Sequence, residues 1–186
     1  EGDHRVYQLP FESTDIVSVR LVYKNALLYA QANNGQIFLY DELYDRFKLV
    51  VDLRKSLGLN FLEVYRIVID NKETIWLASS SGLYCYSNGE PKLVNNLQMD
   101  VRNIVPYDDT NLIYATAEGV SMLNTETLES TSMYEYPTKD GLAVSAFFYD
   151  RKANRLWIGT VSSGLFYYDM KEKRLARVPI EKFPKQ

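Results

Sequence analysis

The sequence predicts an all-β chain made of four copies of one strand-rich repeat, and three observations lead to this prediction. The 186 residues include 15 Tyr, 8 Phe and 2 Trp, and aromatic residues suit the pleated, half-buried surface of a sheet. Short apolar runs alternate with turn residues along the whole chain, which is typical of strands joined by tight turns. A turn glycine recurs at Gly35, Gly82, Gly119 and Gly164, at intervals of 47, 37 and 45 residues.

Repeats of this length with four strands each are typical of β-propeller blades. Each repeat is then one twisted antiparallel sheet. The structural alternative is a β-sandwich or barrel assembled from the same four repeats.

The chain begins with a strand-like stretch that belongs to no complete repeat. Residues 4–10 (HRVYQLP) alternate in polarity, and Pro10 with the polar residues after it ends the run. We interpret residues 1–15 as the last strand of a preceding blade.

Four complete blades are then expected in a single propeller segment. Their predicted boundaries are residues 16–54, 63–97, 100–136 and 143–180. The second blade, for example, reads VYRIVID, TIWLAS, LYCYS and PKLVNNL, with polar or glycine-containing turns between the runs. No helix is required; residues 41–54 carry too few apolar residues at helical spacing and are expected to form at most a single turn.

Two sets of positions align the repeats with one another. Six or seven residues before each turn glycine stands a large apolar residue: Leu28, Trp76, Ile113 and Trp157. Two residues later the chain carries a small residue each time: Ala30, Ala78, Ala115 and Gly159. Small residues allow neighbouring blades to pack closely, face against face.

Composition excludes several classes of function. The chain is 46% hydrophobic and 24% charged, with a net charge of −3 and no block of Lys or Arg, so we expect neither nucleic-acid binding nor attachment to an anionic membrane. No apolar run reaches the roughly 18 residues of a transmembrane helix, so no membrane insertion is predicted for this segment. With one His and one Cys, the chain lacks the donors of the usual zinc and thiol–imidazole sites, and no metal or cofactor is predicted.

Several residues that resemble catalytic groups have simpler structural interpretations. Asp70, Asp108 and Asp150 each end the first strand of a repeat, where an Asp side chain can accept N–H groups of the following turn. One such Asp per blade would be spread around a ring, so we predict no catalytic residue. Trp76 and Trp157 lie within apolar runs and are expected to pack between blades instead of stacking on a sugar. Cys85, within LYCY, is expected to be a core residue.

The candidate ligand site follows from position in the fold. The first strand of each blade lines the central channel of a propeller, and the loops entering those strands form one rim. Near the start of these strands the sequence places six residues that we name as candidate ligand contacts: Arg20, Tyr65, Arg66, Arg102, Asn103 and Ser145. Arginines at a shared mouth can bind a carboxylate, a sulfate or sugar hydroxyls. The alternative is that they are solvated charges at the rim.

Two stretches resemble the two-component regulator propeller repeat, whose pattern is roughly V-x-x-I-x-x-D-x-x-G-x-L-W-I-G-T-x-x-G-L-x-x-Y. They are VYRIVIDNKETIWLASSSGLYCY and VSAFFYDRKANRLWIGTVSSGLFYYD. The first and third repeats match less well, because Leu28 and Ile113 replace Trp. The second and fourth depart from the family at Lys72-Glu73 and Ala153-Asn154, where the family prefers Asp/Asn-Gly.

The resemblance implies the periplasmic sensor region of a hybrid histidine kinase from Bacteroides-type bacteria, anchored in the inner membrane. In that family seven-bladed propellers occur in tandem, the ligands are glycan fragments and signalling involves dimers. Four repeats are about half of such a propeller, so the resemblance predicts a partial propeller. The expected partners are therefore an oligosaccharide, a second copy of the protein and the remaining blades of the parent protein. A propeller scaffold for protein interactions is the first alternative. A propeller lyase or glycosidase is less favoured, because it needs an acid/base pair converging at one rim.

Overall fold

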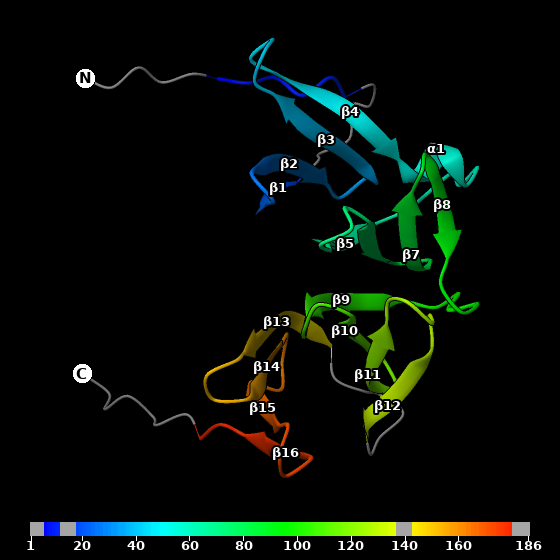
Figure 1. Ribbon diagram of the computed structural model, residues 1–186. Helices are drawn as coiled ribbons and strands as arrows, with labels where there is room; N and C mark the ends of the chain where they lie inside the picture. Colours follow the sequence, from blue (N-terminus) through cyan, green and yellow to red (C-terminus); the bar gives the residue numbers. More distant parts are fainter. Residues whose placement is uncertain (1–5, 12–17, 137–142, 180–186) are drawn as a thin grey trace, which may run out of the picture. The chain divides into compact units, whose positions relative to one another are not determined.

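The computed structural model describes residues 6–11, 18–136 and 143–179. Within these residues sixteen strands form four separate four-stranded antiparallel sheets, each with its strands in sequence order (Figure 1). This confirms the all-β class and the blade-like repeats, and it excludes the alternative of one sandwich or barrel. The chain divides into two compact units, residues 1–98 (unit 1) and 99–186 (unit 2), which we describe separately.

Unit 1 contains the first and second sheets. The strands of the first sheet are β1 (Val19–Lys24), β2 (Leu27–Ala32), β3 (Gln36–Asp41) and β4 (Arg46–Asp52). Those of the second are β5 (Val64–Ile69), β6 (Ile75–Ser79), β7 (Gly82–Ser87) and β8 (Glu90–Leu93).

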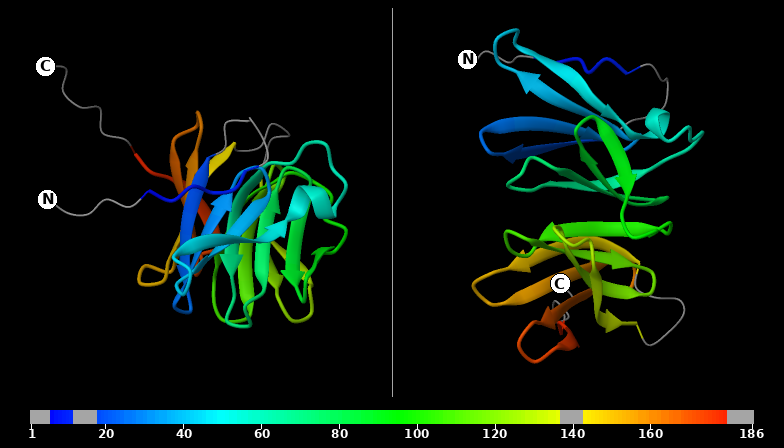
Figure 2. Two further views of the ribbon diagram at one scale, coloured as in Figure 1. Left: turned by 90° about the horizontal axis from the view of Figure 1, so that it is seen from above. Right: turned by 45° about the vertical axis from the view of Figure 1, so that its right-hand side comes forward.

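Unit 2 contains the third and fourth sheets, which can be followed from two further directions in Figure 2. The strands of the third sheet are β9 (Val101–Pro106), β10 (Asn111–Thr116), β11 (Gly119–Asn124) and β12 (Ser130–Glu135). Those of the fourth are β13 (Val144–Asp150), β14 (Arg155–Thr160), β15 (Leu165–Asp169) and β16 (Arg174–Arg177).

The helix α1 (Leu53–Ser56) is a single turn that follows β4. The Asp52 carboxylate caps it by accepting the backbone N–H of Lys55 at 2.9 Å. A short turn was expected in residues 41–54, and it lies at the end of that range. Among the described residues, no helix has both the length and the apolar character that crossing a bilayer requires.

The core of unit 1 lies between the facing sides of its two sheets. Tyr29 and Ile37 of the first sheet pack with Ile67, Ile75 and Leu77 of the second. Burying side chains of this size stabilises a fold by about 1.5–3 kcal/mol each, so this contact holds the two sheets together.

Two hydrogen bonds align the sheets of unit 1. The Gln31 amide donates to the Val64 carbonyl at 2.9 Å, and the Tyr86 hydroxyl donates to the Val50 carbonyl at 3.0 Å. Both cross from one sheet to the other, so they fix the alignment of the two sheets at an otherwise apolar interface.

Unit 2 repeats this packing. Ile113 and Ala115 of the third sheet contact Phe147, Leu156 and Ile158 of the fourth. The Tyr168 hydroxyl donates to the Met133 carbonyl at 3.0 Å, at the place equivalent to the bond from Tyr86. The same face-to-face arrangement of consecutive blades is therefore present in both units.

The strand register corrects the alignment of the first repeat. Tyr29 pairs with Val22 and Leu39, as Trp76 pairs with Val68 and Cys85. Tyr29 thus occupies the Trp position, and Gln31 the position of the small residue that follows it. Placing Leu28 and Ala30 there was wrong by one residue: Tyr29 stands six residues before Gly35, the same spacing that separates Trp76 from Gly82.

The strand expected over residues 4–10 is absent from the described part of that stretch, residues 6–11. A strand is defined by hydrogen bonds to a neighbouring strand, and residues 6–11 instead contact the first sheet through their side chains. Their assignment to a preceding blade stays a prediction.

Cys85 is buried on β7, as its apolar surroundings in the sequence predict. Burial raises the pKa of its thiol above the ordinary value, so both access and thiolate formation are disfavoured. We expect the native chain to react with a thiol reagent such as DTNB at least about 100-fold more slowly than the guanidinium-unfolded chain. Equal rates in the two states would show that the blade opens freely around β7.

Candidate ligand-binding site

A β-bulge recurs at the entrance to the first strand in three of the four sheets. The register shifts between Val64 and Arg66 in the second sheet, opposite Ala115 and Thr116 in the third, and between Val144 and Ala146 in the fourth. The inserted residues are Tyr65, Arg102 and Ser145. A bulge redirects the side chain of the extra residue and increases local twist, and bulges are frequent beside functional sites. The sequence named these three residues by position without predicting the bulge.

The residues that follow the bulges are equivalent to one another. Arg66 pairs with Ala78, Asn103 with Ala115 and Ala146 with Gly159. In the first sheet Arg20 pairs with Gln31 at the same place, with no register shift. Arg20 is therefore the first-blade equivalent of Arg66.

In unit 1, Arg20 and Arg66 form a pair of neighbouring positive charges. Arg66 is half-buried and Arg20 is exposed. Burial lowers the pKa of Arg66, and the nearby charge of Arg20 lowers it further. Like charges held near each other favour an anion that approaches both. Tyr65, next to Arg66 in the chain, is half-buried.

In unit 2, the candidate residues have different surroundings. The Arg102 side chain is exposed and forms an ion pair of 2.6 Å with Asp100. Asn103 is buried, and its side-chain oxygen accepts the backbone N–H of Ile104 at 3.0 Å. Ser145 is exposed. Arg102 and Ser145 are therefore the accessible candidates in this unit, while Asn103 supports the strand beneath.

The three Asp residues singled out in the sequence all hold hairpins, as predicted. The Asp70 carboxylate accepts the N–H groups of Lys72 and Thr74 at 2.8 and 2.9 Å. Equivalent bonds run from turn N–H groups to Asp108 and to Asp150. Three residues that were not predicted from the sequence do the same between the third and fourth strands of a sheet: Asp41, Asn124 and Asp169. Their signal was present, because each ends an apolar run and precedes polar residues.

Hydrogen bonding affects the acidity of two of these groups. For Asp108, partial burial pushes the pKa upward, but hydrogen bonds from Thr110 and Asn111 outweigh it and leave the pKa below the ordinary value. The pKa of Asp169 is lowered chiefly by the backbone N–H of Glu172. Both carboxylates are thus stabilised in the charged form that the turns require.

The turn positions where the sequence departs from the family pattern have left-handed backbone. Glu73 has a φ of 63° and Asn154 a φ of 51°. Glycine adopts this region without steric cost, which gives a physical reason for the family's preference there.

The two tryptophans differ in burial. Trp76 is fully buried, and its indole N–H donates to the Asp70 carboxylate at 2.9 Å, so the prediction of a core role is confirmed for it. Trp157 is half-buried and packs beside Tyr167, with ring centroids 5.6 Å apart. The Arg155 guanidinium lies 4.4 Å from the centroid of Tyr167. Trp157 belongs to the face of the fourth sheet opposite to the one that packs on the third.

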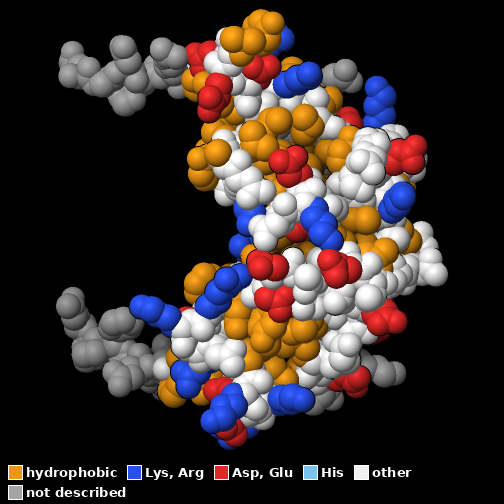
Figure 3. All heavy atoms as spheres, viewed as in Figure 1, with side chains coloured by type: hydrophobic (Ala, Val, Ile, Leu, Met, Phe, Trp, Pro, Cys, Tyr) orange, Lys and Arg blue, Asp and Glu red, His pale blue; other side chains and the backbone are white. Residues whose placement is uncertain are grey.

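Charged groups are dispersed. On the face seen in Figure 3, acidic and basic side chains are intermixed around apolar areas in each unit. In the part of the chain that the structure describes, no group of three or more His, Cys, Asp or Glu side chains is arranged to hold a metal ion.

Comparison with known proteins identifies structural relatives. No protein-family model and no curated protein matches the chain by sequence. Among solved structures, it is similar to the extracellular domain of BT3049, a proposed hybrid two-component system of B. thetaiotaomicron, with a TM-score of 0.70 and 17% identity over 96% of this chain and 24% of that one. It is also similar to the extracellular domain of BT4673, a proposed one-component system of the same organism, with a TM-score of 0.68 and 17% identity over 94% of this chain and 24% of that one.

A third similar structure is the WD40 β-propeller domain of Doa1, with a TM-score of 0.60 and 13% identity over 86% of this chain and 53% of that one. The chain therefore has a β-propeller-like fold, spans about a quarter of the two extracellular domains that it matches, and has its structural neighbours among the extracellular domains of bacterial two-component and one-component systems.

Proposed function

We propose that the chain is a non-catalytic, ligand-binding propeller segment of a periplasmic sensor in a hybrid two-component signalling protein. The observation that carries this proposal is the β-bulge repeated at the entrance of β5, β9 and β13. The backbone feature is the same in three repeats, whereas the inserted side chains differ: Tyr65, Arg102 and Ser145. A common frame that presents different side chains is typical of a recognition surface.

The chemistry of these residues favours an oligosaccharide fragment, in particular one with acidic sugars. The adjacent charges of Arg20 and Arg66 would attract a carboxylate or sulfate, and a guanidinium can bind either group through two parallel hydrogen bonds. Tyr65 offers a ring and a hydroxyl to a sugar. In unit 2, Arg102 and Ser145 offer hydrogen-bond donors of their own at the strand entrances.

Signalling by such a segment requires a ligand that binds two arrangements of the protein with different affinity. We infer that ligand binding at the strand entrances biases the arrangement of a dimer of the parent protein. Similarity of fold to the extracellular domains of BT3049 and BT4673 supports this role.

Isothermal titration calorimetry with acidic oligosaccharides, such as oligogalacturonides, and their neutral counterparts tests the proposal. We expect the wild-type chain to bind acidic members of the panel, and Arg66→Ala to weaken that binding about tenfold or more, because a charge-assisted hydrogen bond contributes roughly 1.5–3 kcal/mol. Arg102→Ala tests the strand entrances of unit 2 separately, and the loss expected there is smaller since this side chain is exposed.

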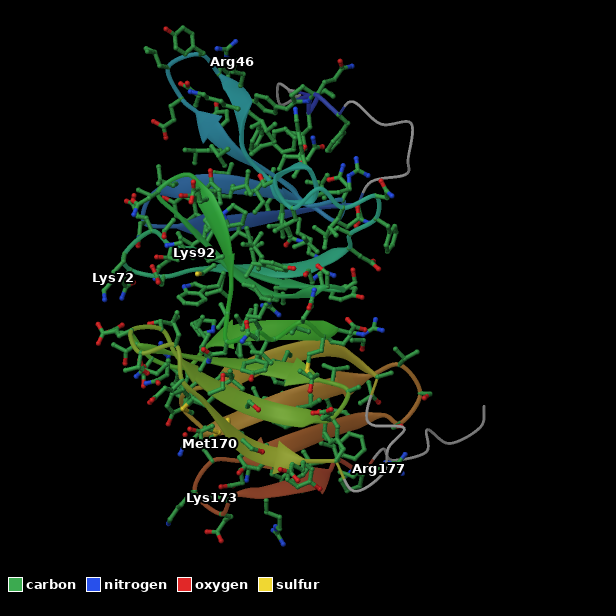
Figure 4. All side chains as sticks on the ribbon, turned by 90° about the vertical axis from the view of Figure 1, so that its right-hand side faces the viewer. Arg46, Lys72, Lys92, Met170, Lys173 and Arg177 are labelled. Carbon is green, nitrogen blue, oxygen red and sulfur yellow. The ribbon has the colours of Figure 1, made fainter. Side chains whose placement is uncertain are left out.

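Two matched variants control for loss of positive charge elsewhere. Arg46 and Arg177 lie on the outermost strands β4 and β16 (Figure 4), and Arg46→Ala and Arg177→Ala should leave the affinity unchanged. Binding that survives Arg66→Ala and Arg102→Ala would refute the assignment of the site. Absence of binding across the panel would favour the scaffold alternative.

A further inference from the structure

The first sheet exposes an apolar ridge on β1. Val19, Leu21 and Tyr23 are 41%, 66% and 72% exposed. Strand register makes them the equivalents of Val64, Ile67 and Ile69 on β5, which are only 0%, 3% and 5% exposed because the first sheet covers them.

The fourth sheet shows the same behaviour in unit 2. Val144 and Phe147 stand at the positions of Val19 and Leu21, and they are 6% and 3% exposed because the third sheet covers them. The next position, Tyr149, packs against Tyr107 of the third repeat with ring centroids 4.9 Å apart. In the second and fourth sheets, the residues at these positions therefore form the contact with the preceding sheet of the same unit.

Residues 7–11 already cover parts of β2, β3 and β4 on the same face of the first sheet. Leu9 and Phe11 pack against Ala30, Ala32 and Phe38, and the Phe11 and Phe38 rings meet edge to face at 5.6 Å.

Tyr7 extends this cover to β3 and β4. Its ring lies 5.8 Å from Tyr40 and 5.9 Å from Phe47, and its hydroxyl donates to Asp45 at 2.7 Å. The segment runs beside these two strands in Figures 1 and 2. The cover therefore ends before β1, where the ridge lies.

A tyrosine on the third strand of the first, second and fourth sheets indicates what residues 7–11 represent. Tyr86 donates to Val50 on β4, and Tyr168 donates to Met133 on β12, so each reaches the outermost strand of the preceding sheet. Tyr40 is the equivalent residue on β3, and the ring beside it belongs to Tyr7. Residue 7 thus lies where the outermost strand of a preceding sheet lies in both units.

We propose that residues 7–11 are the outermost strand of a further blade, and that the ridge Val19–Leu21–Tyr23 docks the three inner strands of that blade. The occupant is a three-stranded antiparallel sheet with an apolar, aromatic face like that of β13–β15. A complete four-stranded blade from a second copy does not fit, because its own outermost strand would coincide with residues 7–11. Residues 7–11 make no ladder hydrogen bonds with any described strand, and pairing with the third strand of the further blade would supply them.

A duplication within the chain provides a defined probe. The full chain is preceded by a second copy of residues 143–171, which contains β13, β14 and β15. Hydrogen exchange measured by mass spectrometry on peptides covering residues 6–11 and 18–24 reports whether the added strands dock. We expect amides in both peptides to exchange at least about tenfold more slowly than in the unmodified chain, with the protein remaining monomeric in sedimentation.

Two variants identify the surface. Leu21→Glu, at an exposed position, should leave the unmodified chain folded but remove the protection in the duplicated one. Trp157→Glu in the added copy alone should do the same, since this residue lies on the face offered to the ridge. Unchanged exchange in residues 6–11 on duplication would overturn the proposal. So would concentration-dependent protection of residues 18–24 in the unmodified chain, which would identify a second copy as the occupant.

Discussion

Replacement of Gly119 by Ala is expected to destabilise unit 2 by about 3 kcal/mol or more. Gly119 begins β11 and pairs with Glu135 of β12, beside a register shift in that ladder. A Cβ at this position would overlap the Tyr134 carbonyl oxygen and lie 3.1 Å from the Glu135 Cα. Both contacts are with backbone, so β12 would have to move away from β11. Urea denaturation followed by the fluorescence of Trp157, the tryptophan of unit 2, measures the change.

Gly58→Ala is the matched control. Gly58 has a φ of +64°, and a Cβ there would have no neighbour within 4 Å. Only the cost of a left-handed backbone then applies, about 1 kcal/mol. If both variants lose the same stability, the effect at Gly119 is conformational and the close approach of β12 is not its cause.

Replacement of Asp70 by Ala is expected to destabilise unit 1 by about 3 kcal/mol. The variant loses the acceptor of two turn N–H groups, each bond contributing about 1 kcal/mol, and it leaves the buried Trp76 indole N–H without a partner, which costs about 1–3 kcal/mol. The change in urea midpoint measures this loss.

Asp150→Ala provides the comparison at the equivalent turn of the fourth sheet. Asp150 accepts the N–H groups of Lys152 and Ala153 at 3.0 and 3.1 Å, and Trp157 is not among its partners in the described hydrogen bonds. We expect a loss of about 1–2 kcal/mol. In a Trp76→Phe background, Asp70→Ala should cost no more than Asp150→Ala. A cost that stays at about 3 kcal/mol would show that the indole bond contributes nothing.

Much of the fold could be predicted because the same pattern of strands and turns occurs in four repeats that can be compared with one another. Strand-length apolar runs recur with the same turn residues, so local preference and pattern agree at every copy. The predicted blade boundaries contain all sixteen described strands. The hairpin role of Asp70, Asp108 and Asp150 also followed from local chemistry, since an Asp reaches only its own turn.

The register could not be predicted in every repeat. Leu28 and Tyr29 are both large and apolar, so the sequence offers no reason to prefer either for the Trp position. Side chains alternate between the two faces of a strand, and a slip of one residue exchanges the faces. Packing against the second sheet places Tyr29 at the Trp position, because its ring is part of the core of unit 1.

The candidate site was likewise predicted only in part. Position along the first strand was sufficient to name Tyr65, Arg102 and Ser145, but the bulge that inserts them depends on pairing with a second strand. Asn103 is buried whereas Arg102 and Ser145 are exposed, and this difference depends on packing against the next sheet. The charge pair of Arg20 and Arg66 also exists only once two sheets have packed.

By itself the sequence therefore determined the class of fold, the number of blades and the turns, because these depend on residues close together in the chain. Tertiary structure decided which face of each strand is buried, where the strands bulge, why Gly119 rather than another residue stands at its turn, and which apolar surface is left for a further blade. These features arise from contacts between neighbouring strands and between sheets, and such contacts join residues that lie far apart in the sequence.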